Sequence, residues 1–254
     1  MILVLAGTLD GRDLAALLAR QGYQVLVSVV SEYGKDLALQ ENLTVHSCPL
    51  DRAGLIDFMQ ANPIKLVVDA THPYAVNISR NAIFACDLLA VPYLRYERSP
   101  LPLPCYDRLF VVPDYARAAQ TAADKGNVVF LTTGSRMLAT FISEPKLAQH
   151  RIVARVLPDP EVIRHCLELG LKPKDIIAMQ GPFSQQLNCA LFTAYQAEVV
   201  VTKESGAIGG SDTKLAAAIS LNLPVVLISR PAIDYGRVVT SFQAALRYIE
   251  AVLQ

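Results

Sequence analysis

The regular alternation of short apolar runs with helical segments is the feature that most constrains this 254-residue chain. Runs such as Ile2–Ala6 and Val225–Ser229 are almost continuously apolar, which indicates strands covered on both faces of a sheet. A segment with helical spacing, such as Leu14–Arg20, follows most of these runs. Because strand–helix–strand units connect through right-handed crossovers, the pattern predicts parallel sheets with helices on both sides.

The same pattern predicts where the individual elements lie. The expected strands are Ile2–Ala6, Gln24–Val30, Leu43–Cys48, Lys65–Ala70, Pro92–Glu97, Leu109–Val112, Val128–Thr132, Arg151–Leu157, Ile176–Met179, Glu198–Thr202 and Val225–Ser229. The expected helices are Leu14–Arg20, a helix capped by Asp51 that ends near Ala61, Asn77–Leu89, a helix capped by Asp114 that ends near Asp124, Arg136–Ile142, Pro160–Leu169, Ser184–Tyr195, Asp212–Leu221 and Phe242–Leu253.

A proline-rich stretch interrupts the alternation. Ser99–Asp107 carries prolines at positions 100, 102 and 104, and proline fixes φ and lacks an N–H donor, which excludes a central strand or a helix. We expect a linker there between two α/β units, one at 1–98 and one at 108–254. The predicted fold class is therefore α/β, with two Rossmann-like units, mostly parallel sheets, and a ligand-binding cleft between the units.

Charge and composition exclude several classes of protein. Lys plus Arg and Asp plus Glu both number 23, so no surplus charge favours nucleic acid or an anionic membrane. The apolar start of the chain is too short for a signal peptide, and no run reaches membrane-spanning length. Scattered cysteines without a CxxC pair indicate reduced thiols, so we expect a cytoplasmic protein, and the sequence leaves its oligomeric state open.

A glycine turn follows the first expected strand. Gly7 lets the backbone approach an anion, and the helix start supplies N–H groups and the positive end of its dipole. Thr8 and Arg12 add a hydroxyl group and a cation. These features predict a site for cofactor phosphates. Gly7 and Gly11 do not have the spacing of GxGxxG, so an ordinary strand–helix turn is the alternative.

The end of the second expected strand bears on the choice of nicotinamide. Glu32 can accept hydrogen bonds from ribose hydroxyls, which favours NADH, whereas Lys35 or the nearby serines can bind a 2′-phosphate, which favours NADPH. The sequence contains both signals and does not choose between them.

Polar residues follow the fourth expected strand as well. Thr71, His72 and Tyr74 come just past its carboxyl end, where ligands bind in open α/β sheets, although an isolated histidine is often structural. The four histidines of the chain lack zinc spacing, so we expect no metal site.

The second unit repeats the strand–glycine–helix pattern at Gly134, Ser135 and Arg136. A longer loop after the tenth expected strand combines glycines, hydroxyls and lysines, a mixture that a purely structural turn does not need. This loop predicts an anion or substrate site. The residues expected to line it are Lys203, Ser205, Gly206, Lys214 and, past the next strand, Arg230.

Several ordered segments give the chain a resemblance to a known family. They are GTLDGR, DATHPYA, LRYER, LTTGSR, ARVLP, QGPFS, TKESGAIGGSDTKLAAA and ISRP, and they extend over nearly the whole chain, from about Ile2 to Pro231. Together they resemble the precorrin-6A reductase family, cobalt-precorrin-6A reductases included. DATHPYA and TKESG…KLAAA are the most specific segments, and GAIGGSDTK departs from the spacing of some members.

The resemblance implies an oxidoreductase of cobalamin biosynthesis with two Rossmann-like domains. Its reaction would be hydride transfer from NADPH or NADH to a double bond of the tetrapyrrole precorrin-6A or cobalt-precorrin-6A, giving precorrin-6B or its cobalt form. The resemblance assigns cofactor contacts to Gly7, Thr8, Arg12, Thr71, His72, Tyr74, Gly134, Ser135 and Arg136. It assigns the substrate pocket to Lys203, Ser205, Gly206, Lys214 and Arg230, and Arg155 is a further candidate for binding substrate carboxylates.

Three other functions stay open at this stage. They are a nicotinamide reductase with another acidic substrate, a transferase that binds S-adenosylmethionine, and a non-catalytic nucleotide-sensing module. The cation at Arg12 beside the first glycine turn favours a phosphate over S-adenosylmethionine. A pure sensor would leave the lysine-rich loop of the second unit unexplained.

Overall fold

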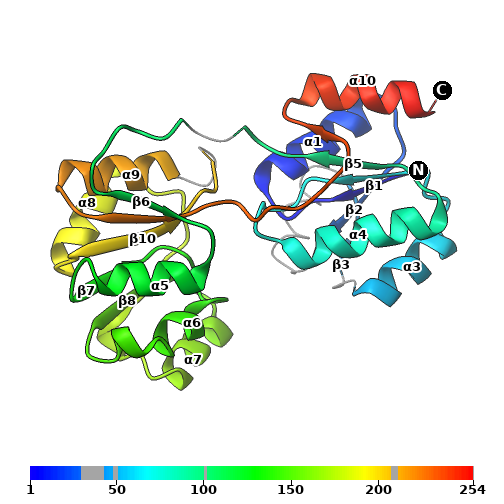
Figure 1. Cartoon of the computed structure of the whole chain (residues 1–254). Coiled ribbons are helices and arrows are strands. Elements are labelled where there is room, and N and C mark those ends of the chain that lie inside the picture. Colours follow the sequence, from blue (N-terminus) through cyan, green and yellow to red (C-terminus); the bar gives the residue numbers. More distant parts are fainter. Residues whose placement is uncertain (30–42, 48–50, 100–101, 207–210, 254) are drawn as a thin grey trace. The chain divides into compact units, whose positions relative to one another are not determined.

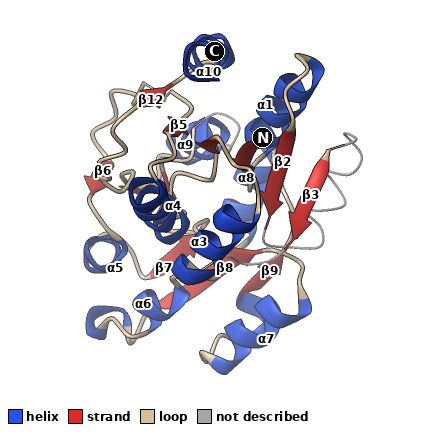
Figure 2. Cartoon of the chain, turned by 90° about the vertical axis from the view of Figure 1, so that its right-hand side faces the viewer, coloured by secondary structure: helices blue, strands red, loops and turns tan. Residues whose placement is uncertain are grey.

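The computed structural model describes residues 1–29, 43–47, 51–99, 102–206 and 211–253. The chain divides into two compact units, Met1–Ser99 together with Ala232–Gln254, and Pro100–Pro231. Each unit is built on its own six-stranded sheet, and all neighbouring strands are parallel (Figures 1 and 2). The predicted α/β class with two parallel sheets is confirmed.

The first sheet has the strand order β12-β5-β4-β1-β2-β3. Its strands are β1 (Ile2–Leu5), β2 (Val25–Val29), β3 (Thr44–Ser47), β4 (Leu66–Asp69), β5 (Tyr93–Tyr96) and β12 (Val238–Val239). The central strands β1 and β4 are buried along their whole length, as their continuous apolar sequences predict.

Helices cover both faces of the first sheet. They are α1 (Leu9–Arg20), α3 (Arg52–Ala61), α4 (Val76–Leu89) and α10 (Phe242–Leu253). Leu14 of α1 and Ile249 of α10 share one buried cluster with Val4 of β1. Leu55 of α3 and Ala82 of α4 are buried in a second cluster on the other face.

Side-chain caps set where several helices begin. Thr8 accepts a hydrogen bond from the amide of Gly11, at 3.2 Å, so α1 begins earlier than its apolar spacing predicts. The caps expected at Asp51 and Asp114 are confirmed, because their carboxylates accept hydrogen bonds from the first turns of α3 and α5 (Tyr115–Ala123).

The second sheet has the strand order β6-β11-β10-β7-β8-β9. Its strands are β6 (Leu109–Val112), β7 (Val128–Leu131), β8 (Arg151–Val156), β9 (Ile176–Ala178), β10 (Val199–Lys203) and β11 (Val225–Ile228). Besides α5, the unit contains α6 (Leu138–Ile142), α7 (Pro160–Glu168), α8 (Gln185–Ala194), α9 (Ser211–Ser220) and the short 3-10 turns Pro145–Leu147 and Pro173–Asp175. Phe130 of β7 and Phe192 of α8 lie at the centre of its core.

The end of the chain, Ala232–Gln254, belongs to the first unit. The expected second unit at 108–254 therefore extended too far, because its last residues pack with the first unit. Val238 pairs with Arg95 and extends the first sheet by β12, a strand too short for its sequence to signal. The red helix α10 then packs beside the blue helix α1 (Figure 1), where Ala245 and Ile249 are fully buried. Burial of this apolar face, rather than position along the chain, decides which unit α10 joins.

No helix in the described part of the chain has the length and apolar character needed to cross a membrane.

Replacing Ile249 by alanine tests this assignment of α10. The change leaves a cavity in the first core, so we expect the free energy of unfolding to fall by about 2–5 kcal/mol. Hydrogen exchange should show the loss of protection in β1 and β4 rather than in the second sheet. Glu250→Ala, on the exposed side of the same helix, is the matched control and should change stability by less than about 0.5 kcal/mol. Unchanged protection of β1 and β4 in the Ile249 variant would contradict the assignment.

Candidate functional site

The glycine turn and the Thr71 loop meet at the carboxyl edge of the first sheet. Strands β1 and β4 are parallel neighbours, so their carboxyl ends lie side by side. The Thr8 hydroxyl donates a hydrogen bond to the carbonyl of Ala70 at 3.1 Å and accepts one from Gly11. The structure therefore brings together two of the loops that the sequence predicts to bind the cofactor.

The two glycines of the turn have different roles. A Cβ added to Gly11 would lie 2.8 Å from the carbonyl oxygen of Ala70, so glycine is needed there for α1 to approach β4. Among the described residues, and apart from the two chain neighbours of Gly7, no atom would lie within 4 Å of a Cβ added there. Gly7 is exposed and leaves open space in front of the α1 amino terminus, as a site that admits a phosphate requires.

Charges around this helix start are partly balanced within the unit. Asp10 is buried and forms an ion pair with Arg98, at 2.9 Å between carboxylate and guanidinium. Because Arg98 offsets this carboxylate, the acid in the first turn repels an incoming anion less. Arg12 lies half-buried in the first turns of α1 and adds a cation. The turn, the helix start and Arg12 fit a phosphate-bearing cofactor.

His72 is held by a local contact. Its Nδ1 accepts a hydrogen bond from the backbone amide of Tyr74, at 3.2 Å. When the ring is neutral, this bond leaves its proton on Nε2. The His72 and Tyr74 rings lie 5.7 Å apart, so both predicted residues belong to one compact turn before α4.

A buried polar network behind this turn was not predicted from the sequence. The carboxylate of Asp69 accepts hydrogen bonds from Thr71, Tyr93 and Arg95. Burial and then the Asp69 carboxylate raise the pKa of Tyr93, so its hydroxyl stays protonated and donates. Two features of the sequence could have indicated this network. Asp69 ends an otherwise apolar strand, and Arg95 lies inside the next strand.

The predicted residues of the second unit follow the carboxyl ends of its strands. Gly134 has φ +81°, a left-handed conformation that favours glycine. A turn closed by the bond from the Leu138 amide to the Ser135 carbonyl follows, and α6 begins later than expected. Arg136, within this turn, is exposed. Gly206 has φ +75° after β10, and Ser205 is buried beside it.

Basic side chains gather at this second edge. Lys203 ends β10, and burial and then Arg136 lower the pKa of Lys203 to about 8. Burial, followed by Arg155 and Lys203, lowers the pKa of Lys214 to about 8, against the opposing effect of Asp212. We call Arg155, Lys203 and Lys214 the basic cluster. Burial lowers the pKa of all three, and the charges of Arg155 and Lys203 lower that of Lys214 further, so a bound anion would favour their charged forms.

Arg155 is held in a defined orientation within the basic cluster. Its Nη1 donates to the side-chain oxygen of Asn188 at 2.8 Å, and its guanidinium lies 4.1 Å from the ring centre of Phe183. Burial lowers its pKa to about 10. Arg230, by contrast, pairs with Glu204 at 3.4 Å, so a carboxylate already offsets part of its charge.

Some predicted positions lie outside the described residues. Glu32 and Lys35, the two candidates for ribose recognition, are among them, and so are Gly209 and Gly210 of the lysine-rich loop. Among the residues that the structure does describe, no three His, Cys, Asp or Glu side chains form a group that could hold a metal ion.

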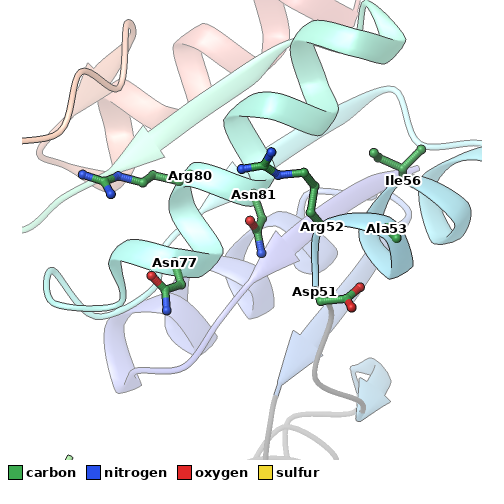
Figure 3. A pocket seen from close by; sticks show the side chains of 7 residues that line it. All are labelled: Asp51, Arg52, Ala53, Ile56, Asn77, Arg80 and Asn81. Carbon is green, nitrogen blue, oxygen red and sulfur yellow. The ribbon is translucent and has the colours of Figure 1, made fainter.

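A hollow of about 710 Å³ lies between α3 and α4 (Figure 3). None of its described lining residues belongs to the predicted cofactor or substrate set. Its acid, Asp51, already caps α3, and the guanidinium of Arg52 lies 4.5 Å from the ring centre of Phe84. The hollow is therefore not part of the candidate site.

Comparison with known proteins agrees along almost the entire chain. The family model of precorrin-6x reductases, CbiJ/CobK, matches residues 1–250. A cobalt-precorrin-6A reductase of Priestia megaterium is 41% identical over 96% of this chain and 95% of its own length. A precorrin-6A reductase of Rhodobacter capsulatus is 32% identical over 98% of this chain and 95% of its own. A solved structure of a CobK precorrin-6A reductase matches with a TM-score of 0.82 and 31% identity, over 99% and 96% of the two chains.

Alanine substitutions at the two glycines test their assigned roles. Gly11→Ala places a methyl group against the backbone of Ala70, and we expect stability to fall by about 1–3 kcal/mol. Gly7→Ala adds a methyl group in open space and should change stability by less than about 0.5 kcal/mol. Urea unfolding of both variants measures the difference, and equal stability would show that the turn tolerates a Cβ at both positions.

Proposed function

This chain belongs to the precorrin-6x reductase family, and we propose that it reduces a carbon–carbon double bond of precorrin-6A or cobalt-precorrin-6A with a nicotinamide as hydride donor. The observation that carries the proposal is the family match over residues 1–250, together with relatives of nearly equal length that are named as reductases of these two substrates. The alternatives of a transferase and of a nucleotide sensor have no support among these matches.

The first unit supplies the residues that we propose to hold the cofactor. Open space at Gly7, the amino terminus of α1 and Arg12 suit its phosphates, and the turn of Thr71, His72 and Tyr74 lies at the same edge. When bound, the reduced nicotinamide supplies the hydride. The chain contributes orientation, and holding two reactants in attack geometry can lower a barrier by roughly 7–11 kcal/mol.

The second unit supplies the residues that we propose to hold the substrate. The family resemblance implies a macrocycle with several carboxylates, and the basic cluster offers three cations against them. A buried charge-assisted hydrogen bond contributes about 1.5–3 kcal/mol. Three further residues of this unit remain predicted substrate contacts, Ser205, Gly206 and Arg230, and Arg136 remains a predicted cofactor contact.

An anaerobic assay with each substrate and each nicotinamide tests the function. We expect nicotinamide oxidation with a tetrapyrrole and none without it. The relative that is 41% identical is named for the cobalt form, so we expect a larger kcat/KM with cobalt-precorrin-6A than with precorrin-6A. Gly7→Val should keep the fold but fill the space through which the cofactor phosphate reaches the helix start. It should therefore lower turnover with every combination of tetrapyrrole and nicotinamide. Absence of turnover with both tetrapyrroles and both nicotinamides would overturn the function.

The pH dependence of substrate binding tests the basic cluster. The amines of Lys203 and Lys214 have their pKa lowered to about 8 from 10.5, so they carry positive charge below this pH and lose it above. The KM for the anionic substrate should therefore rise as the pH rises from 7 to 9.5. Lys203→Met should raise the KM about ten-fold at pH 7, about 1.4 kcal/mol, and weaken the pH dependence.

The exposed Lys174 in the same unit provides the control for this experiment, because Lys174→Met removes an equal charge away from the cluster. An identical effect of both substitutions would indicate a general charge effect instead of a site. Stability gives a second check of the sign. Because the unfolded amines bind protons near pH 10.5 and the folded ones only near pH 8, the chain loses stability as the pH falls from 10.5 to about 8, and a bound polyanion should raise Tm more at pH 7 than at pH 10.

A further inference from the structure

The fully buried carboxylate of Asp69 is the centre of a polar network at the end of β4. Its Oδ1 accepts hydrogen bonds from the amide of Thr71 at 3.0 Å, from the Thr71 hydroxyl at 2.6 Å and from Nη1 of Arg95 at 2.8 Å. Its Oδ2 accepts a hydrogen bond from the Tyr93 hydroxyl at 2.7 Å. The two oxygens thus have separate partners, with Thr71 and Arg95 on one and Tyr93 on the other.

Arg95 completes this network from the neighbouring strand. It lies opposite Asp69 in the register of β4 and β5 and is fully buried. Its Nη1 also donates to the Thr71 hydroxyl at 3.1 Å, and its Nε donates to Glu97 at 3.1 Å. The ring of Tyr235, from the segment that returns to the first unit, lies 4.8 Å from its guanidinium carbon.

The network is a poor device for stability alone. Burying an ion pair costs desolvation that well-packed apolar side chains would avoid. In addition, Nη2 of Arg95 is buried without a hydrogen-bond partner among the described residues, which adds a further cost. The rest of β4 is apolar and Leu94 of β5 is fully buried, so an apolar pair would fit these surroundings. The presence of the Asp69–Arg95 pair is better explained by the conformation that it imposes on Thr71.

Thr71 begins the turn that contains His72. Three contacts with Asp69 and Arg95 fix its backbone and hydroxyl, and the bond from the Tyr74 amide to His72 closes the turn at its other end. The preceding carbonyl, of Ala70, accepts the hydrogen bond from Thr8. The turn is therefore held between the buried network and the glycine turn.

We propose that Asp69 and Arg95 are positioning residues that hold the turn Thr71–Tyr74 in the conformation that binds the nicotinamide cofactor. The inference rests on the proposed function. Both side chains have 0% exposure, so they act through Thr71 and do not touch the ligand themselves.

Three variants of the full chain separate positioning from stability. Arg95→Lys keeps the charge but loses the planar guanidinium, which places Nη1 on Asp69 and Thr71 while Nε holds Glu97. The double variant Asp69→Asn, Arg95→Met removes both charges of the buried pair, so neither is left buried alone, and Glu97, which loses the bond from Nε, is partly exposed. Tyr93→Phe is the matched control, since it removes a bond to the same carboxylate on the oxygen that Thr71 does not use.

Nucleotide binding is measured first, by titration of NADPH and NADH without the tetrapyrrole, and Tm is measured in parallel. We expect Arg95→Lys and the double variant to raise the nucleotide Kd and KM by about ten-fold, with the KM for the tetrapyrrole within about two-fold of wild type. Tyr93→Phe should lower Tm and leave the nucleotide Kd within about two-fold.

Two results would overturn the positioning role. One is a nucleotide Kd that stays near the wild-type value in Arg95→Lys and in the double variant. The other is an equal loss of affinity in Tyr93→Phe, which would show that any weakening of the network acts through stability. A wild-type chain that binds neither nucleotide would overturn the proposed function itself, which distinguishes the two failures.

Discussion

Parallel pairing of buried strands is the constraint on which both candidate sites depend. In each sheet every neighbouring pair is parallel, so the carboxyl ends of all strands lie at one edge. Residues far apart in the chain meet there, as Thr8 and Ala70 do in the first unit. Polar groups concentrate at these edges because the strands themselves are apolar and covered on both faces.

The two edges differ in how they balance charge. In the first unit the buried ions are paired, Asp10 with Arg98 and Asp69 with Arg95, and the helix start supplies a partial positive charge. In the second unit three basic side chains gather at the edge, and burial lowers the pKa of each of them. These charges agree with the proposed binding of the cofactor at the first edge and of the polycarboxylate substrate at the second.

Glycine has two different roles in the turn between β1 and α1. Gly11 allows α1 to pack against the end of β4, which is a requirement of the fold, whereas Gly7 leaves space in front of the helix, which is a requirement of a ligand. The buried carboxylate of Asp69 adds a third element, because it ties the neighbouring Thr71 turn to the strand beneath it. Fold and candidate site share the same few backbone positions.

The sequence by itself determined the class of fold, most strand positions, the caps at Asp51 and Asp114, and the loops where polar residues follow strands. Each of these depends on local spacing, which is visible in one dimension. Only the tertiary structure decided that α10 and β12 complete the first unit and that Arg95 lies opposite Asp69. It also decided that Arg155 and the buried Lys214 lie close enough for their charges to interact. These features depend on which apolar faces and strand edges pack together, and such long-range pairing leaves no fixed spacing in the sequence.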